Sequence, residues 1–318
     1  MTKYLITGVF GFIGSYLTKY VLGNMQDISV VGVGRNTNQK NLRRLEGFLG
    51  DPRLKIIYKD ISKNNLTEIF DGVDIAFNMA ASTFVDYSIR DPKPFIENNV
   101  IGTFNILEAA RKSPSLKKIF IISTDEVYGP ILEGKWSENS PLNPSNPYSS
   151  SKAAADTITM SYYTTYGLPV IITRTENVYG PYQGCEKVIP TFVKKALNNE
   201  LLPVYGDGHH RRMWFHVEDK CRALLHLAEK GTPGEIYHLA GEQELENLEL
   251  AKRILKILNK PETLITFLPD HNIRPGHDRR YALDVTKLKS TGWAPKYNIE
   301  TGLPEVVTWY VKNTWWLD

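Results

Sequence analysis

The chain alternates short apolar runs with longer segments of helical periodicity. The apolar runs are rich in β-branched residues and lie at 3–7, 28–33, 54–61, 73–81, 119–124 and 168–177. Because most of these runs are continuously apolar rather than alternating, they are typical of strands in a parallel sheet that is covered on both faces. The pattern therefore predicts a doubly wound α/β sheet, which binds its ligands at the carboxyl ends of the strands.

The pattern changes after about residue 180. Helical segments at 187–199 and 247–259 are interleaved with Pro, Gly and aromatic residues, which predicts a smaller, irregular α/β lobe beside the sheet. We expect two domains. The first covers 1–176 and about 204–240, and the second is discontinuous, covering about 177–203 and 241–318.

Composition excludes several classes of protein. At 318 residues, with 42% hydrophobic and 23% charged residues, the chain has the make-up of an ordinary folded protein. Its net charge of +3 comes from evenly mixed acids and bases, so no nucleic-acid partner is expected. The 2 cysteines have no metal-binding spacing, which predicts neither a disulfide framework nor a metal site. Without a long apolar run or a leader-like start, we expect a cytoplasmic protein with no membrane segment.

The first strand ends in the glycine-rich sequence GVFGFIGS. Gly8 permits a tight turn, Gly11 lets the backbone approach a phosphate, and Gly14 allows close packing of the next helix. The N–H groups at the start of that helix, including those of Phe12 and Ile13, face the anion. Since the motif follows a strand and opens a helix, it predicts a dinucleotide-binding site of the Rossmann type.

The end of the second strand bears on the choice of cofactor. An acid that binds the adenosine ribose of NAD is usual there, but this chain has Arg35. An arginine can pair with the 2′-phosphate of NADP, so this feature favours NADP over NAD, unless Arg35 stacks on adenine or faces solvent. Asp60 and Ile61 are expected beside the adenine, and Ala80-Ala81 beside the nicotinamide ribose.

A predicted helix carries a candidate proton acceptor. Tyr148 and Lys152 stand four residues apart after Pro147, so they lie on one face of the helix. A nearby ammonium lowers the pKa of a phenol, which predicts that Tyr148 acts as a base toward a hydroxyl group that loses hydride to the nicotinamide.

Two successive acids, Asp125 and Glu126, follow the strand predicted at 119–124. Such a pair can be a solvated turn, a helix cap or a proton-transfer pair. In different environments, two adjacent carboxyl groups can act as an acid and a base.

These motifs together resemble one family. The chain is similar over its full length to the extended short-chain dehydrogenases/reductases, and among them to the nucleoside-diphosphate-sugar 4,6-dehydratases, especially those that act on dTDP-glucose. The matching segments are GVFGFIG (8–14), Ala80-Ala81, part of VDYSIRDP (85–92), NNVIGT (98–103), STDEVYG (123–129), NPYSSSKAAAD (146–156), ENVYGPYQ (176–183), EKVIP (186–190), LPVYGDG (202–208), RPGHDRRYAL (274–283) and GWAPKY (292–297).

The resemblance implies a reaction and a role for each catalytic residue. The cofactor oxidises the sugar at C4, water is eliminated from C5 and C6, and hydride returns to C6, giving a 4-keto-6-deoxy sugar nucleotide. Tyr148 and Lys152 would carry out the oxidation while Thr124 holds the 4-oxygen. Glu126 would take the C5 proton, and Asp125 would protonate the leaving hydroxyl.

The resemblance also implies binding residues and partners. The first domain would bind the dinucleotide, NAD being the usual cofactor of the family, with Asn98 among its contacts. The second would bind a dTDP- or UDP-hexose, and the protein would form a homodimer through helices of the first domain. The expected substrate-binding residues are Thr83, Asn177, Lys187, Val188, Val204, Arg212, Asn247, Arg274, His277 and Tyr281.

Several positions depart from the family pattern. Residues 82–87 read STFVDY where Glu-Ser-His-Val-Asp-Arg is usual, so a charged and a titratable group are lost beside the sugar. Met213 stands where the family usually has Asp. These changes leave open a nucleotide-sugar epimerase, or a dehydratase of different regiochemistry such as 5,6-elimination on a substrate like UDP-GlcNAc. A catalytically idle nucleotide sensor is a third hypothesis, which the joint presence of the catalytic residues disfavours.

Overall fold

The structure, a computed structural model, describes residues 1–35, 38–63, 65–269 and 278–318. Within these residues, seven parallel strands form the central sheet in the order β10-β6-β5-β4-β1-β2-β3. The strands are β1 Thr2–Thr7, β2 Ile28–Gly34, β3 Leu54–Tyr58, β4 Ile75–Asn78, β5 Lys118–Thr124, β6 Val170–Thr175 and β10 Ile236–Leu239. The predicted doubly wound sheet is confirmed, and its strand order reverses between β1 and β4, where such sheets open a ligand crevice.

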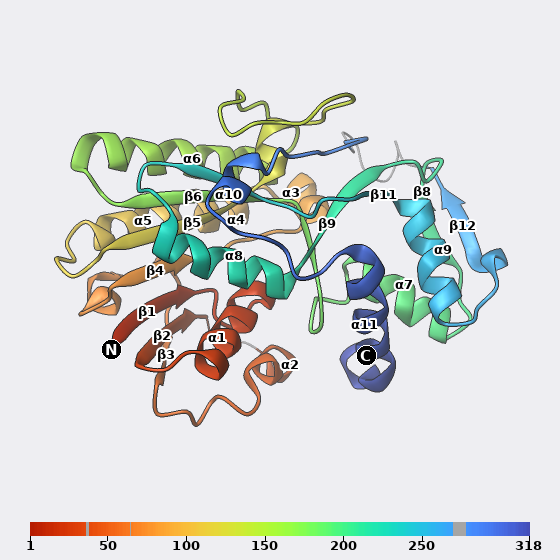
Figure 1. Ribbon diagram of the computed structural model, residues 1–318, viewed down its shortest axis with the longest axis horizontal. Coiled ribbons are helices and arrows are strands. Elements are labelled where there is room, and N and C mark those ends of the chain that lie inside the picture. The colour runs from red at the N-terminus through yellow and green to blue at the C-terminus, as the bar shows by residue number, and fades with distance from the viewer. Residues whose placement is uncertain (36–37, 64, 270–277) are drawn as a thin grey trace.

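Helices cover both faces of the sheet (Figure 1). The helices are α1 Phe12–Asn24, α2 Gln39–Leu42, α3 Val85–Arg90, α4 Lys93–Phe95, α5 Gly102–Ala110, α6 Pro147–Tyr166, α7 Val188–Leu197, α8 Val217–Lys230, α9 Asn247–Ile257, α10 Thr286–Ser290 and α11 Ile299–Lys312. Short turns of other helical type lie at Arg43–Leu45 (η1), Thr67–Phe70 (η2), Ile96–Ile101 (η3), Asp125–Tyr128 (η4), Glu262–Leu264 (η5) and Thr314–Trp316 (η6). Among the residues described, no helix has the length and apolarity that crossing a membrane requires.

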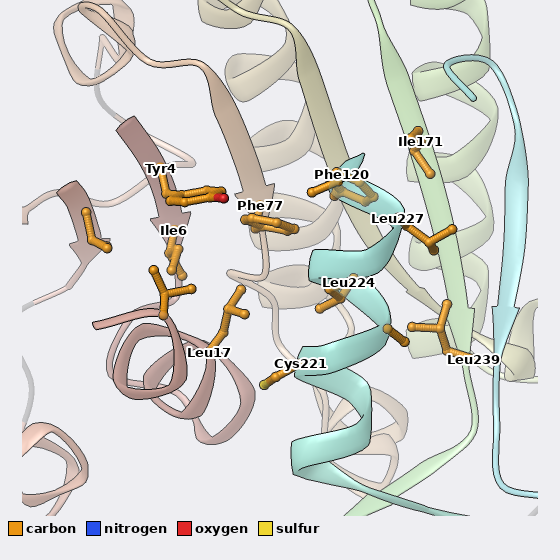
Figure 2. Close-up of a cluster of buried hydrophobic side chains, with 14 of the residues drawn as sticks. Tyr4, Ile6, Leu17, Phe77, Phe120, Ile171, Cys221, Leu224, Leu227 and Leu239 are labelled. Atoms are coloured by element: carbon orange, nitrogen blue, oxygen red, sulfur yellow. The ribbon is translucent and has the colours of Figure 1, made fainter. Parts of the chain in front are cut away.

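The core has one layer on each side of the sheet because strand side chains alternate between the faces. On one face, Phe120 and Ile171 pack with Leu17 of α1 and with Leu224 and Leu227 of α8 (Figure 2). The adjacent strand residues point the other way. They form a second cluster with α5 and α6 that includes Ile119, Ile121, Val170, Ile172, Ile106, Leu107 and Tyr162.

The second lobe lies beside the sheet and contains α7, α9 and α11 (Figure 1). Strand β12 (Ile265–Leu268) pairs with β8 (Leu202–Tyr205), while β9 (Arg211–His216) lies between β11 (Glu244–Glu246) and β7 (Asn177–Tyr179). The helical patterns predicted at 187–199 and 247–259 correspond to α7 and α9. The exact domain boundaries stay a prediction.

Candidate active site

A cavity of about 730 Å³ opens at the carboxyl ends of the central strands and is lined by both lobes. It brings together most of the predicted site residues: Gly8, Gly11, Phe12, Ile13, Gly14, Ala81, Thr83, Thr124, Asp125, Glu126, Tyr148, Lys152, Asn177, Lys187, Val188, Val204, Arg212, Asn247 and Tyr281. Other predicted residues do not belong to this lining: Arg35, Asp60, Ile61, Ala80 and Asn98. Arg274 and His277 fall outside the described residues.

The glycine-rich turn after β1 forms a backbone cradle at one end of the cavity. Gly8 has a φ of +66°, and a Cβ atom there would lie 2.9 Å from the backbone nitrogen of Ala80. A Cβ at Gly14 would lie 2.3 Å from the carbonyl oxygen of Gly8, so neither position admits a side chain. Helix α1 begins at Phe12 with no acid in its first turn, which leaves its N–H groups suited to a phosphate. This arrangement fits the diphosphate of a nicotinamide dinucleotide.

Three of the predicted cofactor residues outside the lining, Arg35, Asp60 and Asn98, interact with other side chains of the protein. Arg35 is exposed and its charge acts on Asp60. Burial by itself raises the pKa of Asp60. Hydrogen bonds from Ser62 and the charge of Arg35 lower it by more, so the pKa of Asp60 lies below its usual value. The Asn98 amide donates to the Ser82 hydroxyl at 2.9 Å. Cofactor roles for these residues stay predictions.

The turn that carries the two acids is held by Thr124, the last residue of β5. The Thr124 hydroxyl accepts a hydrogen bond from the Glu126 backbone N–H at 3.3 Å and donates to Asp125 Oδ1 at 3.0 Å. Thr124 therefore caps the short helix η4, and neither acid acts as the cap. Asp125 is only 3% exposed, whereas Glu126 is half-buried, so the acids lie in different environments rather than in a solvated turn.

Burial makes Asp125 a proton donor near neutral pH. Loss of water around its carboxyl, and then the charge of Glu126, raise the pKa of Asp125 to about 7. The Thr124 hydrogen bond and the charge of Arg212 oppose this rise. A general acid works best when its pKa lies near the working pH, and Asp125 meets that condition.

Helix α6 places Tyr148 and Lys152 beside the acids. Asn146 and Ser149 form a reciprocal capping box, and Pro147 occupies the first turn, so the start of the helix is fixed. Tyr148 and Lys152 are both buried and both line the cavity, which agrees with the shared helix face that their spacing predicts. The Lys152 ammonium donates to the carbonyl oxygen of Ile122 at 2.6 Å.

One prediction about this pair is wrong. We expected Lys152 to lower the pKa of Tyr148, but burial and then the charge of Glu126 raise it, against a hydrogen bond with Thr124 that lowers it. Burial also lowers the pKa of Lys152. The reason is that desolvation disfavours both charged forms, and helical spacing carries no information about burial.

The second lobe supplies cations and aromatic rings to the cavity. Arg212 is 7% exposed, its guanidinium lies 4.6 Å from the centre of the Tyr281 ring, and it donates to the Asp278 carbonyl at 2.8 Å. The Tyr281 hydroxyl donates to the Asp278 carboxylate. At the cavity wall, the Lys187 ammonium lies 5.3 Å from the centre of the Phe84 ring. Buried guanidinium groups suit phosphate recognition.

Several buried ionisable residues in the lining were missed by sequence analysis, among them Glu176 and Lys220. Glu176 directly follows β6, is 4% exposed, and accepts the Met213 N–H at 2.8 Å through Oε2. Lys220 of α8 donates to the Thr175 hydroxyl at 2.7 Å, and burial lowers its pKa to about 7. The position of Glu176 at a strand's carboxyl end could have identified it. Lys220 lies in a helix with several charged residues and had no such signal.

Comparison with known proteins identifies the family. Residues 5–306 match the model of the GDP-mannose 4,6 dehydratase family. The chain belongs to this family. It is therefore an extended short-chain dehydrogenase/reductase of the nucleotide-sugar 4,6-dehydratase type, and an enzyme of the hydro-lyase class.

Several known proteins are similar to this chain over nearly the full length of both. The low-salt glycan biosynthesis protein Agl12 of Haloferax volcanii is 43% identical, with 96% of this chain and 98% of that protein covered. The dTDP-glucose 4,6-dehydratase of Escherichia coli is 40% identical over 99% of this chain and 95% of its own. A crystal structure of DesIV, the dTDP-glucose 4,6-dehydratase of Streptomyces venezuelae, with NAD bound, superposes with a TM-score of 0.93 at 39% identity, covering 100% of this chain and 99% of that chain.

The raised pKa of Asp125 predicts a specific pH dependence of stability. Its pKa is about 7 in the folded protein and about 3.9 in an unfolded chain, so folding binds a proton between these values. As the pH rises from about 4 to 7, the wild-type unfolding free energy should fall relative to that of Asp125→Asn by up to about 1.4 kcal/mol per pH unit. Denaturant titrations at a series of pH values measure this, with the exposed Asp91→Asn as control. Parallel curves for wild type and Asp125→Asn would contradict it.

Proposed function

We propose that this enzyme converts a dTDP-hexose, dTDP-glucose in the first instance, into its 4-keto-6-deoxy form. The observation that carries the proposal is the acid pair in the cavity: a deeply buried Asp125 with a pKa of about 7 beside a half-buried Glu126. Tyr148 and Lys152 line the same cavity. The names of the Escherichia coli and Streptomyces venezuelae relatives support dTDP-glucose as the substrate.

The oxidation at C4 uses Tyr148, Lys152 and Thr124. Bound NAD would accept hydride from C4 and later return it to C6. Tyr148 Oη would take the proton of the C4 hydroxyl as a phenolate, a form that burial opposes and that the positive charge of bound NAD would favour, while Thr124 Oγ1 orients the 4-oxygen. The hydrogen bond between Thr124 and Tyr148 places the two side chains for this task.

The elimination uses the acid pair. A ketone at C4 acidifies the C5 proton, which Glu126 removes, while Asp125 protonates the hydroxyl that leaves C6. Their environments fit this division: burial favours the neutral form of Asp125, and Glu126 is the more accessible of the two carboxyl groups.

The second lobe binds the nucleotide. Arg212 would meet the diphosphate, a task for which a buried guanidinium is suited. Its carbonyl and aromatic contacts fix the guanidinium before substrate enters. The other predicted contacts in the lining are Thr83, Asn177, Lys187, Val188, Val204, Asn247 and Tyr281.

Loss of water from the substrate tests this function. The purified enzyme should convert dTDP-glucose to a product lighter by one water in mass spectrometry, and UDP-glucose and UDP-GlcNAc should react more slowly. Glu126→Gln should still reduce the bound cofactor, seen by absorbance, but eliminate water at least about 100-fold more slowly because the base is lost. The exposed Glu133→Gln is the matched control and should behave as wild type.

Other products would identify the alternatives. A change of stereochemistry without loss of mass would contradict the proposal and indicate an epimerase. NMR of the product would reveal elimination at different carbons, and absence of turnover with normal ligand binding would indicate a sensor.

The bound cofactor is a separate proposal, and we favour NAD. The DesIV structure contains NAD. In this chain the positive charge of Arg35 already interacts with the Asp60 carboxylate, so Arg35 has less need of a 2′-phosphate as a partner. Denaturing the purified protein should release NAD, identified by mass spectrometry, and Arg35→Ala should leave the amount bound within about twofold. Release of NADP would show that the sequence pattern at Arg35 decides the cofactor.

We also propose a homodimer. Ile96 and Ile101 of η3, Phe104 of α5, and Tyr163 and Tyr166 of α6 are exposed apolar side chains on neighbouring helices of the first lobe. A second copy would cover this surface and remove it from water.

A charge on that surface tests the dimer. Light scattering should give the mass of two chains for wild type and of one chain for Ile101→Glu, because a buried carboxylate destabilises the interface. Leu132→Glu, at an exposed position outside this surface, is the control and should remain dimeric. A wild-type mass of one chain would contradict the proposal.

A further inference from the structure

Glu176 lies in the same cavity as the acid pair but has no role in the mechanism above. Its carboxyl and that of Asp125 are each at least nine-tenths buried, and both residues line the cavity. Each carboxyl has one oxygen in use: Glu176 Oε2 accepts the Met213 N–H, and Asp125 Oδ1 accepts the Thr124 hydroxyl. Among the described residues, Glu176 Oε1 and Asp125 Oδ2 are buried without a hydrogen-bond partner.

A buried polar atom without a partner costs free energy unless a ligand satisfies it. Two such oxygens on one cavity, when their carboxyl groups are protonated, are therefore suited to a group that accepts two hydrogen bonds. A hydroxyl group of the substrate has this property, because its oxygen has two acceptor lone pairs.

Glu176 meets this hydroxyl as a neutral acid. Burial, and then the charge of Asp125, raise the pKa of Glu176 well above its ordinary value. The N–H groups of Met213 and Leu283 and the charge of Arg212 oppose the rise without cancelling it. Arg280 also faces Glu176 electrostatically, but its guanidinium is paired with Glu244. With Oε2 accepting the Met213 N–H, the proton on the carboxyl belongs on Oε1, which makes this atom a donor.

Resting on the proposed function, we propose that Glu176 is a further catalytic residue, whose neutral carboxyl donates a hydrogen bond from Oε1 to the C6 hydroxyl that leaves as water. The leaving oxygen then has two acidic partners, Asp125 and Glu176. Donors placed where negative charge develops stabilise the transition state, most strongly in a cavity that excludes water.

The proton count distinguishes the two acids. The C5–H bond breaks, its proton goes to Glu126, and its electron pair forms the C5–C6 double bond. The C6–O bond breaks with its electrons on oxygen, which takes the proton of Asp125 and becomes water. Glu176 keeps its own proton and stabilises the charge on oxygen until that transfer is complete.

Substitution by the neutral isostere tests the proposal. In Glu176→Gln the side-chain carbonyl can still accept the Met213 N–H, but the amide is a weaker donor than a carboxylic acid. Elimination from dTDP-glucose should slow by roughly 10- to 100-fold, while reduction of the cofactor at the first step stays within about threefold of wild type. Glu138→Gln is the matched control because Glu138 also accepts a backbone N–H, and its pKa is also raised by burial, but it does not line the cavity.

The leaving group separates a catalytic from a structural role. With dTDP-6-deoxy-6-fluoroglucose, fluoride departs with much less need of protonation, so the defect of Glu176→Gln should shrink to within about threefold of wild type. An equal loss with both substrates, or no loss with either, would overturn the proposal. Failure of wild type to release water from dTDP-glucose is a different result, because it would refute the proposed function itself.

A spectroscopic measurement covers the case in which Glu176→Gln does not fold. In the Glu126→Gln background, where substrate persists, infrared difference spectra with ¹³C-labelled glutamate report the carbonyl stretch of neutral Glu side chains. Binding of dTDP-glucose should shift this band, and binding of a dTDP-pentose that lacks C6 should not. An identical spectrum with both ligands would overturn the proposal.

Discussion

The withdrawal of the Asp125 carboxyl from water is the constraint on which the site depends. A buried carboxyl keeps its proton at neutral pH only if water stays excluded, and an unpaired buried charge is costly. Strand β5 meets this condition because it lies between β4 and β6, and Ile119, Phe120 and Ile121 along it are fully buried. The Thr124 hydroxyl then fixes the carboxyl in place at the end of the strand. The rigid sheet therefore holds the Asp125 carboxyl in the buried position in which it keeps its proton.

The second lobe completes this environment because its strand β7 continues directly from strand β6 of the central sheet. Strand β7 follows β6 after a single residue, Glu176, and its parallel pairing with β9 sets Asn177 opposite Trp214. The preceding pair in this register is Glu176 and Met213, which explains why the carboxyl of one accepts the N–H of the other. Strand β9, which contains Met213, also brings Arg212 to the cavity. One short pair of strands therefore holds in place both Glu176 and Arg212, to which we assign acid chemistry and phosphate recognition.

Local spacing made much of this predictable. The glycine-rich turn, the acid pair after a strand, and Tyr148 with Lys152 on one helix each depend on residues close together in sequence. The raised pKa of Tyr148 was not predictable, because it depends on burial by distant segments. The proximity of Glu176 to Asp125 depends on the pairing of β5 with β6, which periodicity alone does not specify. Lys220 reaches the cavity from a helix on one face of the sheet, and no local pattern indicates which side chain of such a helix is buried.

Residues 82–87, which depart from the family pattern, contribute Phe84 to the cavity wall. Ser82 is fixed by the Asn99 side chain, which accepts its N–H at 2.8 Å and donates to its carbonyl at 3.0 Å. Phe84 therefore stands at a defined place in the cavity wall, against the Tyr87 ring and the Lys187 ammonium. The Phe84 ring cannot donate or accept a proton, so it can meet a sugar only through shape and apolar contact. The buried carboxyl groups of Asp125 and Glu176 belong to other segments of the lining, so a change of sugar at residues 82–87 need not alter the acids that we assign to the elimination.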